Sequence, residues 1–166
     1  EVVEGRSPWI DSLMAVSRTL GCERTSLRNV LVTAMTRDMG AVYGRSKIVL
    51  APSLGWESGS RVLAEASLNG VPAMVSARGG SPEMIGAGGI TLTLPEVMHA
   101  VPYDQILAKT GIETIAGIIE RLYDDLVYYQ DLVQRTKQHA DQCHNIEKNA
   151  DALHQRFEDL IAQPNI

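Results

Sequence analysis

The stretch KIVLAPSLGWESGSRVLAEASLNGVPAMVS, residues 47–76, has the pattern of two strands joined by a helix. Its first apolar run, residues 47–51, is hydrophobic on both faces of an extended chain, which is typical of a parallel strand covered by helices on both sides. Short β-branched runs, separated by helical patterns, recur at residues 2–3, 29–33, 72–76 and 90–93. We therefore expect an α/β fold with a Rossmann-like, doubly wound parallel sheet.

The helix inside this stretch is predicted to begin after Ser60 and to end at Asn69-Gly70, where a residue that tolerates a left-handed conformation can close it. One face of this helix is apolar, formed by Val62, Leu63 and Ala66. Two further helices are expected upstream, one from Ser7-Pro8 to Gly21 and a short one over residues 38–45.

The pattern changes after residue 93. Residues 94–103 hold two prolines and are expected to form a loop, and most of the remainder has the apolar periodicity of helices. We predict one domain over residues 1–166, with an α/β core at about 1–94 and a helical C-terminal segment at 103–163. Because the first predicted strand, at residues 2–3, is short and touches the first residue of the chain, we expect another strand and helix upstream of this chain.

The composition argues against several classes of function. The chain has 166 residues, 45% of them hydrophobic and 21% charged, and a formal net charge of -5, which argues against nucleic acid as a partner. No apolar run reaches the roughly 18 residues of a membrane span, so we expect no transmembrane segment and a cytoplasmic protein. Cys22 and Cys143 are expected to be reduced thiols. Three histidines lack the spacing of metal ligands and are expected on solvated helix faces, with no metal site: His139, His144 and His154.

Two glutamates, Glu57 and Glu65, flank the predicted start of the central helix. In open parallel sheets ligands bind beyond the carboxyl ends of the strands, where residues 52–60 are expected to lie, and the free amides of a helix start can bind phosphate. Gly59 would let a ligand approach the backbone, and Glu65 lies roughly 7 to 8 Å along the helix axis from Ser60. Carboxylates accept hydrogen bonds from vicinal hydroxyls, so a sugar and a ribose at the two ends of a diphosphate would fit.

These two residues alone leave a simpler interpretation open. Acidic residues near a helix start commonly complement the helix dipole. Glu65 is also spaced to form an ion pair with Arg61 across one turn of the helix.

A longer set of landmarks resembles the donor-binding half of the retaining, group-one glycosyltransferases of the GT-B fold. The landmarks are the run from Ala51-Pro52 through Glu57 to Glu65-Ala66, the turn Asn69-Gly70-Val71-Pro72, and the segment Gly79-Gly80-Ser81-Pro82-Glu83-Met84-Ile85-Gly86. The hallmark of that family, two glutamates separated by seven residues, is matched by Glu57 and Glu65. The resemblance extends from about residue 2 to about residue 129. It implies the C-terminal, nucleotide-sugar-binding domain of such an enzyme, without its N-terminal acceptor-binding domain.

The resemblance also implies roles for individual residues. Glu57 is expected to be the catalytic residue that contacts the transferred sugar, and Glu65 is expected to hold the ribose hydroxyls. The phosphates are expected to lie near Gly59, Ser60, Arg61 and Val62. The sugar is expected near Gly80, and the base near Met35 and Thr36. The family retains the anomeric configuration and needs no metal, so we expect no cofactor. The expected partners are a UDP- or GDP-sugar and the missing N-terminal domain, through which the protein would reach a membrane surface.

Two features depart from the family pattern. Ser58 replaces the usual glycine after the first glutamate, and Gly59-Ser60 replaces an aromatic residue followed by glycine. The Arg/Lys pair that neutralises the diphosphate in the family would lie upstream, where this chain offers only Gly5-Arg6. As an isolated hexosyltransferase fragment the chain is expected to bind donor weakly and to transfer nothing. Two alternatives stay open: a sugar-nucleotide epimerase of related fold, and a non-catalytic nucleotide-binding domain.

Smaller features near the glutamates are less specific. Trp56 could form a wall for the sugar, but ordinary packing is the expectation for such a ring. Ser53 and Ser76 at strand ends are expected to cap backbone groups rather than to bind ligand. The pair Gly79-Gly80 either brings amides toward the sugar or forms a plain turn.

Overall fold

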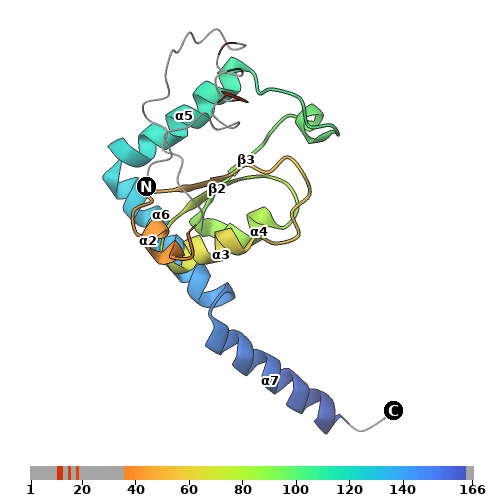
Figure 1. Cartoon of the computed structure of the whole chain (residues 1–166). Helices are drawn as coiled ribbons and strands as arrows, with labels where there is room; N and C mark the ends of the chain where they lie inside the picture. Colours follow the sequence, from red (N-terminus) through yellow and green to blue (C-terminus); the bar gives the residue numbers. More distant parts are fainter. Residues whose placement is uncertain (1–10, 13–14, 16–17, 19–35, 164–166) are drawn as a thin grey trace.

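The computed structural model describes residues 11–12, 15, 18 and 36–163 (Figure 1). The strands predicted at residues 2–3 and 29–33, and most of the helix predicted from Ser7 to Gly21, lie outside the described residues. In the continuous part the elements follow in the order α2 (Met39–Tyr43), β1 (Val49–Ala51), α3 (Arg61–Leu68), β2 (Ala73–Ser76), α4 (Ser81–Ile85), η1 (Gly86–Gly88), β3 (Ile90–Leu92), η2 (Glu96–His99), α5 (Lys109–Asp124), α6 (Leu126–Cys143) and α7 (Ile146–Ala162).

The three strands form a parallel sheet in the order β1-β2-β3. Val49 lies opposite Ala73 in the first pair, and Met74 lies opposite Ile90 in the second. Parallel neighbours need a crossover connection, which α3 supplies between β1 and β2, and α4 with η1 between β2 and β3. Figure 1 shows α3 and α4 on one side of the sheet and α5 on the other. The predicted α/β fold, a parallel sheet with helices on both faces, is confirmed.

Helix α3 begins and ends where its sequence predicts. Ser60 has the extended backbone of an N-cap residue, and Arg61 is the first helical residue. At the other end Gly70 has a φ of 70°, and the amide of Val71 donates to the carbonyl of Ala66 at 2.8 Å, a geometry that closes the last turn. Leu63 is completely buried, which is worth roughly 1.5 to 3 kcal/mol for a side chain of this size.

The core lies between β1, β2 and the helices that cover one face of the sheet. Strand β2 is buried along its whole length. One buried cluster joins the sheet to α3 and α4, and a second joins it to α2. The members of the first are Leu63, Ala73, Val75 and Ile85, and those of the second are Tyr43, Ala66 and Val71. On the opposite face Leu50 of β1 is 53% exposed, so α2, α3 and α4 supply most of the packing described for this strand.

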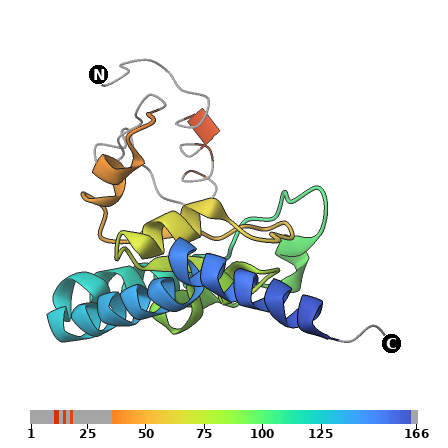
Figure 2. The same ribbon diagram turned by 90° about the horizontal axis from the view of Figure 1, so that it is seen from below.

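Helices fill the C-terminal segment, as its periodicity predicts. The side chain of Asp125 caps α6 through the amide of Tyr128, and Asn145 caps α7 through the amides of Glu147 and Lys148. Helix α6 packs against α3 and η1, whereas α7 has no buried residue and extends away from the sheet. In the view of Figure 2, α6 and α7 follow one another along one side of the molecule. None of the helices described here has both the length and the apolar composition that crossing a bilayer requires.

The expectation of solvated histidines is wrong for two of the three on α6 and α7. His144 lies with Nε2 2.9 Å from the carbonyl oxygen of Met84, and His139 packs against Gly86, so both are half-buried. The polar face of α6 turns toward the short helices after β2, which the sequence pattern of α6 alone does not reveal. His154 on α7 is exposed, as expected.

The contact between η1 and α6 should be sensitive to the size of one residue. A Cβ atom on Gly88 would lie 2.3 Å from the Cα of Thr136, which is backbone and cannot rotate away. We predict that Gly88→Ala lowers the free energy of unfolding by about 1 to 3 kcal/mol, the usual cost of overpacking. Urea denaturation measures this change.

Gly117 in α5 provides the matched control. A Cβ atom there meets nothing within 4 Å in the part of the chain that the structure describes. Because alanine restricts the unfolded chain more than glycine does, Gly117→Ala should stabilise the protein by about 0.4 to 1 kcal/mol. Equal effects of the two substitutions would contradict the packing described for η1 and α6.

Candidate functional site

The loop of residues 52–60 is held at the carboxyl edge of the sheet by groups that follow all three strands. The hydroxyl of Ser76, at the end of β2, donates to the carbonyl oxygen of Ser53. Ser53 in turn donates to Oε1 of Glu57 at 3.3 Å. After β3, Nδ1 of the buried His99 lies 2.9 Å from the carbonyl oxygen of Leu54. Glu57, which is half-buried, is therefore fixed near the ends of the strands.

The loop after β2 closes on this segment through its two glycines. The amide of Gly80 donates to the carbonyl oxygen of Glu57 at 2.6 Å. A Cβ atom on Gly79 would lie 2.1 Å from the same oxygen, and one on Gly80 would lie 2.4 Å from the carbonyl oxygen of Ser58. Gly79 also has a φ of 63°, which glycine adopts without steric cost. Since the Gly80 amide already has a partner, any contact of Gly80 with a ligand would have to use another atom.

The start of α3 presents open amide groups next to this loop. The first N–H groups of any helix lack a partner inside the helix, and the side chain of Ser60 makes no capping hydrogen bond to them in the described structure. Gly59 is exposed, and the atom nearest to a Cβ atom placed there is Sδ of Met84 at 3.9 Å. Arg61 and Val62 are exposed as well. A cation such as Arg61 is unfavourable at this end of a helix, whereas an anion bound there would be stabilised by both the amides and the guanidinium.

Glu65 is held from another part of the fold. It is half-buried on α3, and its Oε2 accepts a hydrogen bond from the hydroxyl of Tyr43 on α2 at 3.1 Å. Among the ion pairs formed by the described residues, none joins Glu65 to Arg61. Thr36, just before α2, is exposed and accepts a hydrogen bond from the amide of Asp38 through Oγ1 at 3.1 Å. Met35 lies outside the described residues.

Burial raises the pKa of the Tyr43 hydroxyl above its usual value, and the hydrogen bond to Glu65 and the negative charge of that carboxylate raise it further. Tyr43 is therefore a neutral hydrogen-bond donor throughout the physiological range of pH. Glu65 has this donor at one oxygen of its carboxylate.

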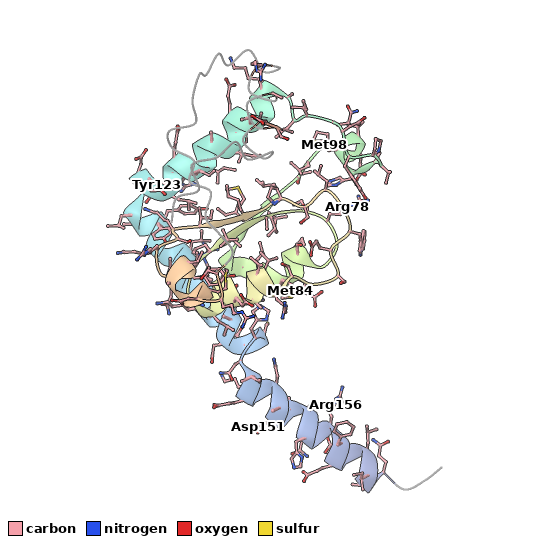
Figure 3. The ribbon with its side chains drawn as sticks, viewed as in Figure 1. Arg78, Met84, Met98, Tyr123, Asp151 and Arg156 are labelled. Atoms are coloured by element: carbon pink, nitrogen blue, oxygen red, sulfur yellow. The ribbon has the colours of Figure 1, made fainter. Side chains whose placement is uncertain are left out.

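The expectation that Trp56 packs in the ordinary way is wrong. Trp56 is 76% exposed beside Glu57, and the guanidinium carbon of Arg78 lies 5.7 Å from the centroid of its ring. Arg78 also lies 3.8 Å from the carboxylate of Glu96, and its Nε is buried without a hydrogen-bond partner in the described structure. Figure 3 shows Arg78, in the loop after β2, and Met98, in η2, at this end of the sheet.

Three residues of this region have no counterpart in the sequence-based predictions: Tyr43, Arg78 and His99. Tyr43 lies inside the short helix predicted over residues 38–45, but its hydrogen bond to Glu65 joins residues that are distant in the chain. Nothing in the sequence connects Arg78 or His99 with the loop of residues 52–60. Within the described residues no group of three or more His, Cys, Asp or Glu side chains is arranged to hold a metal ion.

Comparisons with known proteins show a family and a fold to which the chain is similar. Residues 5–125, most of the chain, match the family described as glycosyl transferases group 1. HepE of Anabaena, solved in complex with UDP-glucose, matches with a TM-score of 0.65 and 19% identity over 95% of this chain and 38% of HepE. Sucrose-phosphate synthase from Thermosynechococcus elongatus matches with a TM-score of 0.60 and 19% identity over 95% of this chain and 37% of that enzyme. No curated protein sequence matches the chain.

At these identities the two solved structures show a shared fold. The chain spans less than two fifths of the length of either of them.

The two glycines of the loop after β2 should tolerate no side chain. We predict that Gly79→Ala lowers the free energy of unfolding by about 1 to 3 kcal/mol. The added methyl group would occupy the space of the Glu57 backbone, and alanine is strained at the positive φ of this position. Gly59→Ala, in open space, should leave it within about 0.5 kcal/mol. Thermal unfolding followed by circular dichroism compares the three proteins, and an unchanged Gly79→Ala variant would show that the two loops do not meet as described.

Proposed function

This chain belongs to the group 1 glycosyl transferases, and we propose that it is the half of a retaining enzyme that binds the donor, a nucleoside diphosphate sugar. The observation that carries the proposal is the uncapped start of α3, which lies between Glu57 at the carboxyl edge of the sheet and Glu65 one turn into the helix. Open amides favour a diphosphate, and the two carboxylates are suited to hydroxyl groups on either side of it.

Each predicted residue then has a task. The amides of Ser60 to Val62 bind the phosphates, with Gly59 allowing close approach and Arg61 adding a positive charge. Glu57 accepts hydrogen bonds from hydroxyls of the transferred sugar, and Gly80 lies near that end. Glu65 accepts hydrogen bonds from the ribose, and Met35 and Thr36 line the base.

The reaction proposed is transfer of a hexose with retention of the anomeric configuration. Departure of the nucleoside diphosphate leaves positive charge at the anomeric carbon and adds negative charge to the phosphate. Preorganised amides and Arg61 at the start of α3 stabilise the second charge as it develops. The proposed role of the Glu57 carboxylate is to face the positive charge at the anomeric carbon. The acceptor nucleophile and a complementary half would come from elsewhere, so the chain alone is expected to bind donor and not to transfer it.

The base and the place of the reaction are also proposals. HepE, which shares the fold, was solved with UDP-glucose, so a uridine nucleotide is the first donor to test. We infer a cytoplasmic location, and we propose that the whole enzyme meets its acceptor at a membrane surface.

Binding of UDP and of UDP-glucose to the chain and its variants tests the proposal. We predict that Glu65→Ala weakens binding of both ligands about tenfold or more, since each loses a charge-assisted hydrogen bond to the ribose. Glu57→Ala should weaken UDP-glucose alone, because UDP has no sugar for it to contact. Isothermal titration calorimetry, repeated with GDP and GDP-mannose, measures both effects.

Gly59→Ala separates binding from folding in the same assay. This variant is expected to unfold at the temperature of the unmodified chain and yet to bind UDP more weakly, because the added methyl group stands where the diphosphate approaches. If no variant differs from the unmodified chain, the start of α3 is not the phosphate site. Sugar transfer or epimerisation by the chain alone would contradict the proposed role as a donor-binding half.

A further inference from the structure

Tyr43 occupies a buried position that ties α2 to α3. It is the last residue of α2, a helix capped at its start by Oδ1 of Asp38, which accepts from the amide of Ala41 at 3.0 Å. Tyr43 is 3% exposed and packs in one cluster with Ala66 of α3 and with Val71. Packing of this kind needs only an aromatic ring, so phenylalanine would serve equally well for the core.

The hydroxyl of Tyr43 forms a hydrogen bond, whereas its ring contributes to packing. It lies 3.1 Å from Oε2 of Glu65 and 3.4 Å from the carbonyl oxygen of Val62. One hydroxyl has one proton to donate, and the charged and nearer acceptor is the carboxylate. A hydrogen bond to a charged acceptor is about twice as strong as one between neutral groups, so this bond restrains the rotation of the Glu65 side chain.

The restraint leaves part of the carboxylate open. Oε1 of Glu65 has no hydrogen-bond partner among the described residues, and Glu65 forms no ion pair there. A half-buried carboxylate held at one oxygen presents the other in a defined direction. Such an oxygen is prepared to accept a hydrogen bond without first losing rotational freedom.

We propose that Tyr43 is a positioning residue for nucleotide binding: its hydroxyl holds Oε2 of Glu65 so that Oε1 faces the ribose hydroxyls of the donor. This inference rests on the proposed function, in which Glu65 binds the ribose. It adds that α2, through Tyr43, determines how strongly the protein distinguishes a ribose from a sugar without those hydroxyls.

Tyr43→Phe tests the inference with UDP and 2′,3′-dideoxy-UDP as probes. The substitution keeps the buried ring, so the thermal unfolding temperature should change little. UDP should bind about 5- to 10-fold more weakly, the usual effect of losing one hydrogen bond, because the Glu65 side chain is no longer held by Tyr43. The dideoxy analogue offers no ribose hydroxyls and should bind the variant and the unmodified chain equally. A purely structural role for Tyr43 would weaken both ligands to the same extent and would overturn the inference.

Glu65→Ala and the double variant separate this inference from the proposed function. Glu65→Ala should abolish the preference for UDP over the dideoxy analogue, and adding Tyr43→Phe should cause no further loss. If Glu65→Ala removes the preference but Tyr43→Phe preserves it, the positioning role is wrong and the role of Glu65 stands. If Glu65→Ala leaves the preference intact, the ribose role of Glu65 is wrong, and the inference fails with it.

A spectroscopic measurement tests the same contact without altering Tyr43. In the unmodified chain the charge and hydrogen bond of Glu65 contribute to the raised pKa of Tyr43. In Glu65→Ala, ultraviolet difference spectra over alkaline pH should therefore show one of the five tyrosines ionising at a lower pH than before. Unchanged ionisation of every tyrosine would show that the two side chains do not meet, which would overturn the inference even if Tyr43→Phe failed to fold.

Discussion

The backbone hydrogen bond from the amide of Gly80 to the carbonyl oxygen of Glu57 is the contact on which the candidate site depends. It joins the loops that follow β1 and β2 at a distance that only glycine permits, since a side chain on Gly79 or Gly80 would occupy the space of the Glu57 and Ser58 backbone. Two loops in such close contact cannot move independently. The segment that leads from Glu57 into α3 is therefore directed by the sheet, and the open amides at the start of α3 come to lie beside the carboxyl edge.

The two glutamates are supported by different parts of the fold. Glu57 is held from the carboxyl edge by Ser53 and by the loop after β2. Glu65 is held from α2, a helix that precedes the sheet in the chain, through Tyr43. A ligand that contacts both carboxylates would thus depend on contacts from two different parts of the fold. A change in the contacts of one glutamate would affect one end of the ligand more than the other. This division is suited to an elongated donor with distinct sugar and nucleoside ends.

Much of the fold could be predicted because its signals are local. The strands at residues 47–51, 72–76 and 90–93 are short apolar runs between turns, and the boundaries of α3 follow from Ser60 and Gly70. The site residues Glu57 and Glu65 were found from their spacing and a family resemblance, and their roles remain predictions. The contacts of Tyr43, Arg78 and His99 could not be predicted, because they join residues that are distant in the chain, as His99 is from Leu54. For the same reason the exposure of Trp56 and the burial of His139 and His144 followed from tertiary packing rather than from their neighbours in sequence.

The lack of buried residues on α7 has a consequence for how the chain opens. A helix that contributes nothing to the core can unwind without breaking the contacts that stabilise the sheet, whereas α3 and β2 lose theirs only when the domain unfolds. Deuterium labelling of the backbone would accordingly proceed on two timescales within one chain, quickly along α7 and slowly in β2. The last helix can then fray or reform at little energetic cost to the region that contains Glu57 and Glu65.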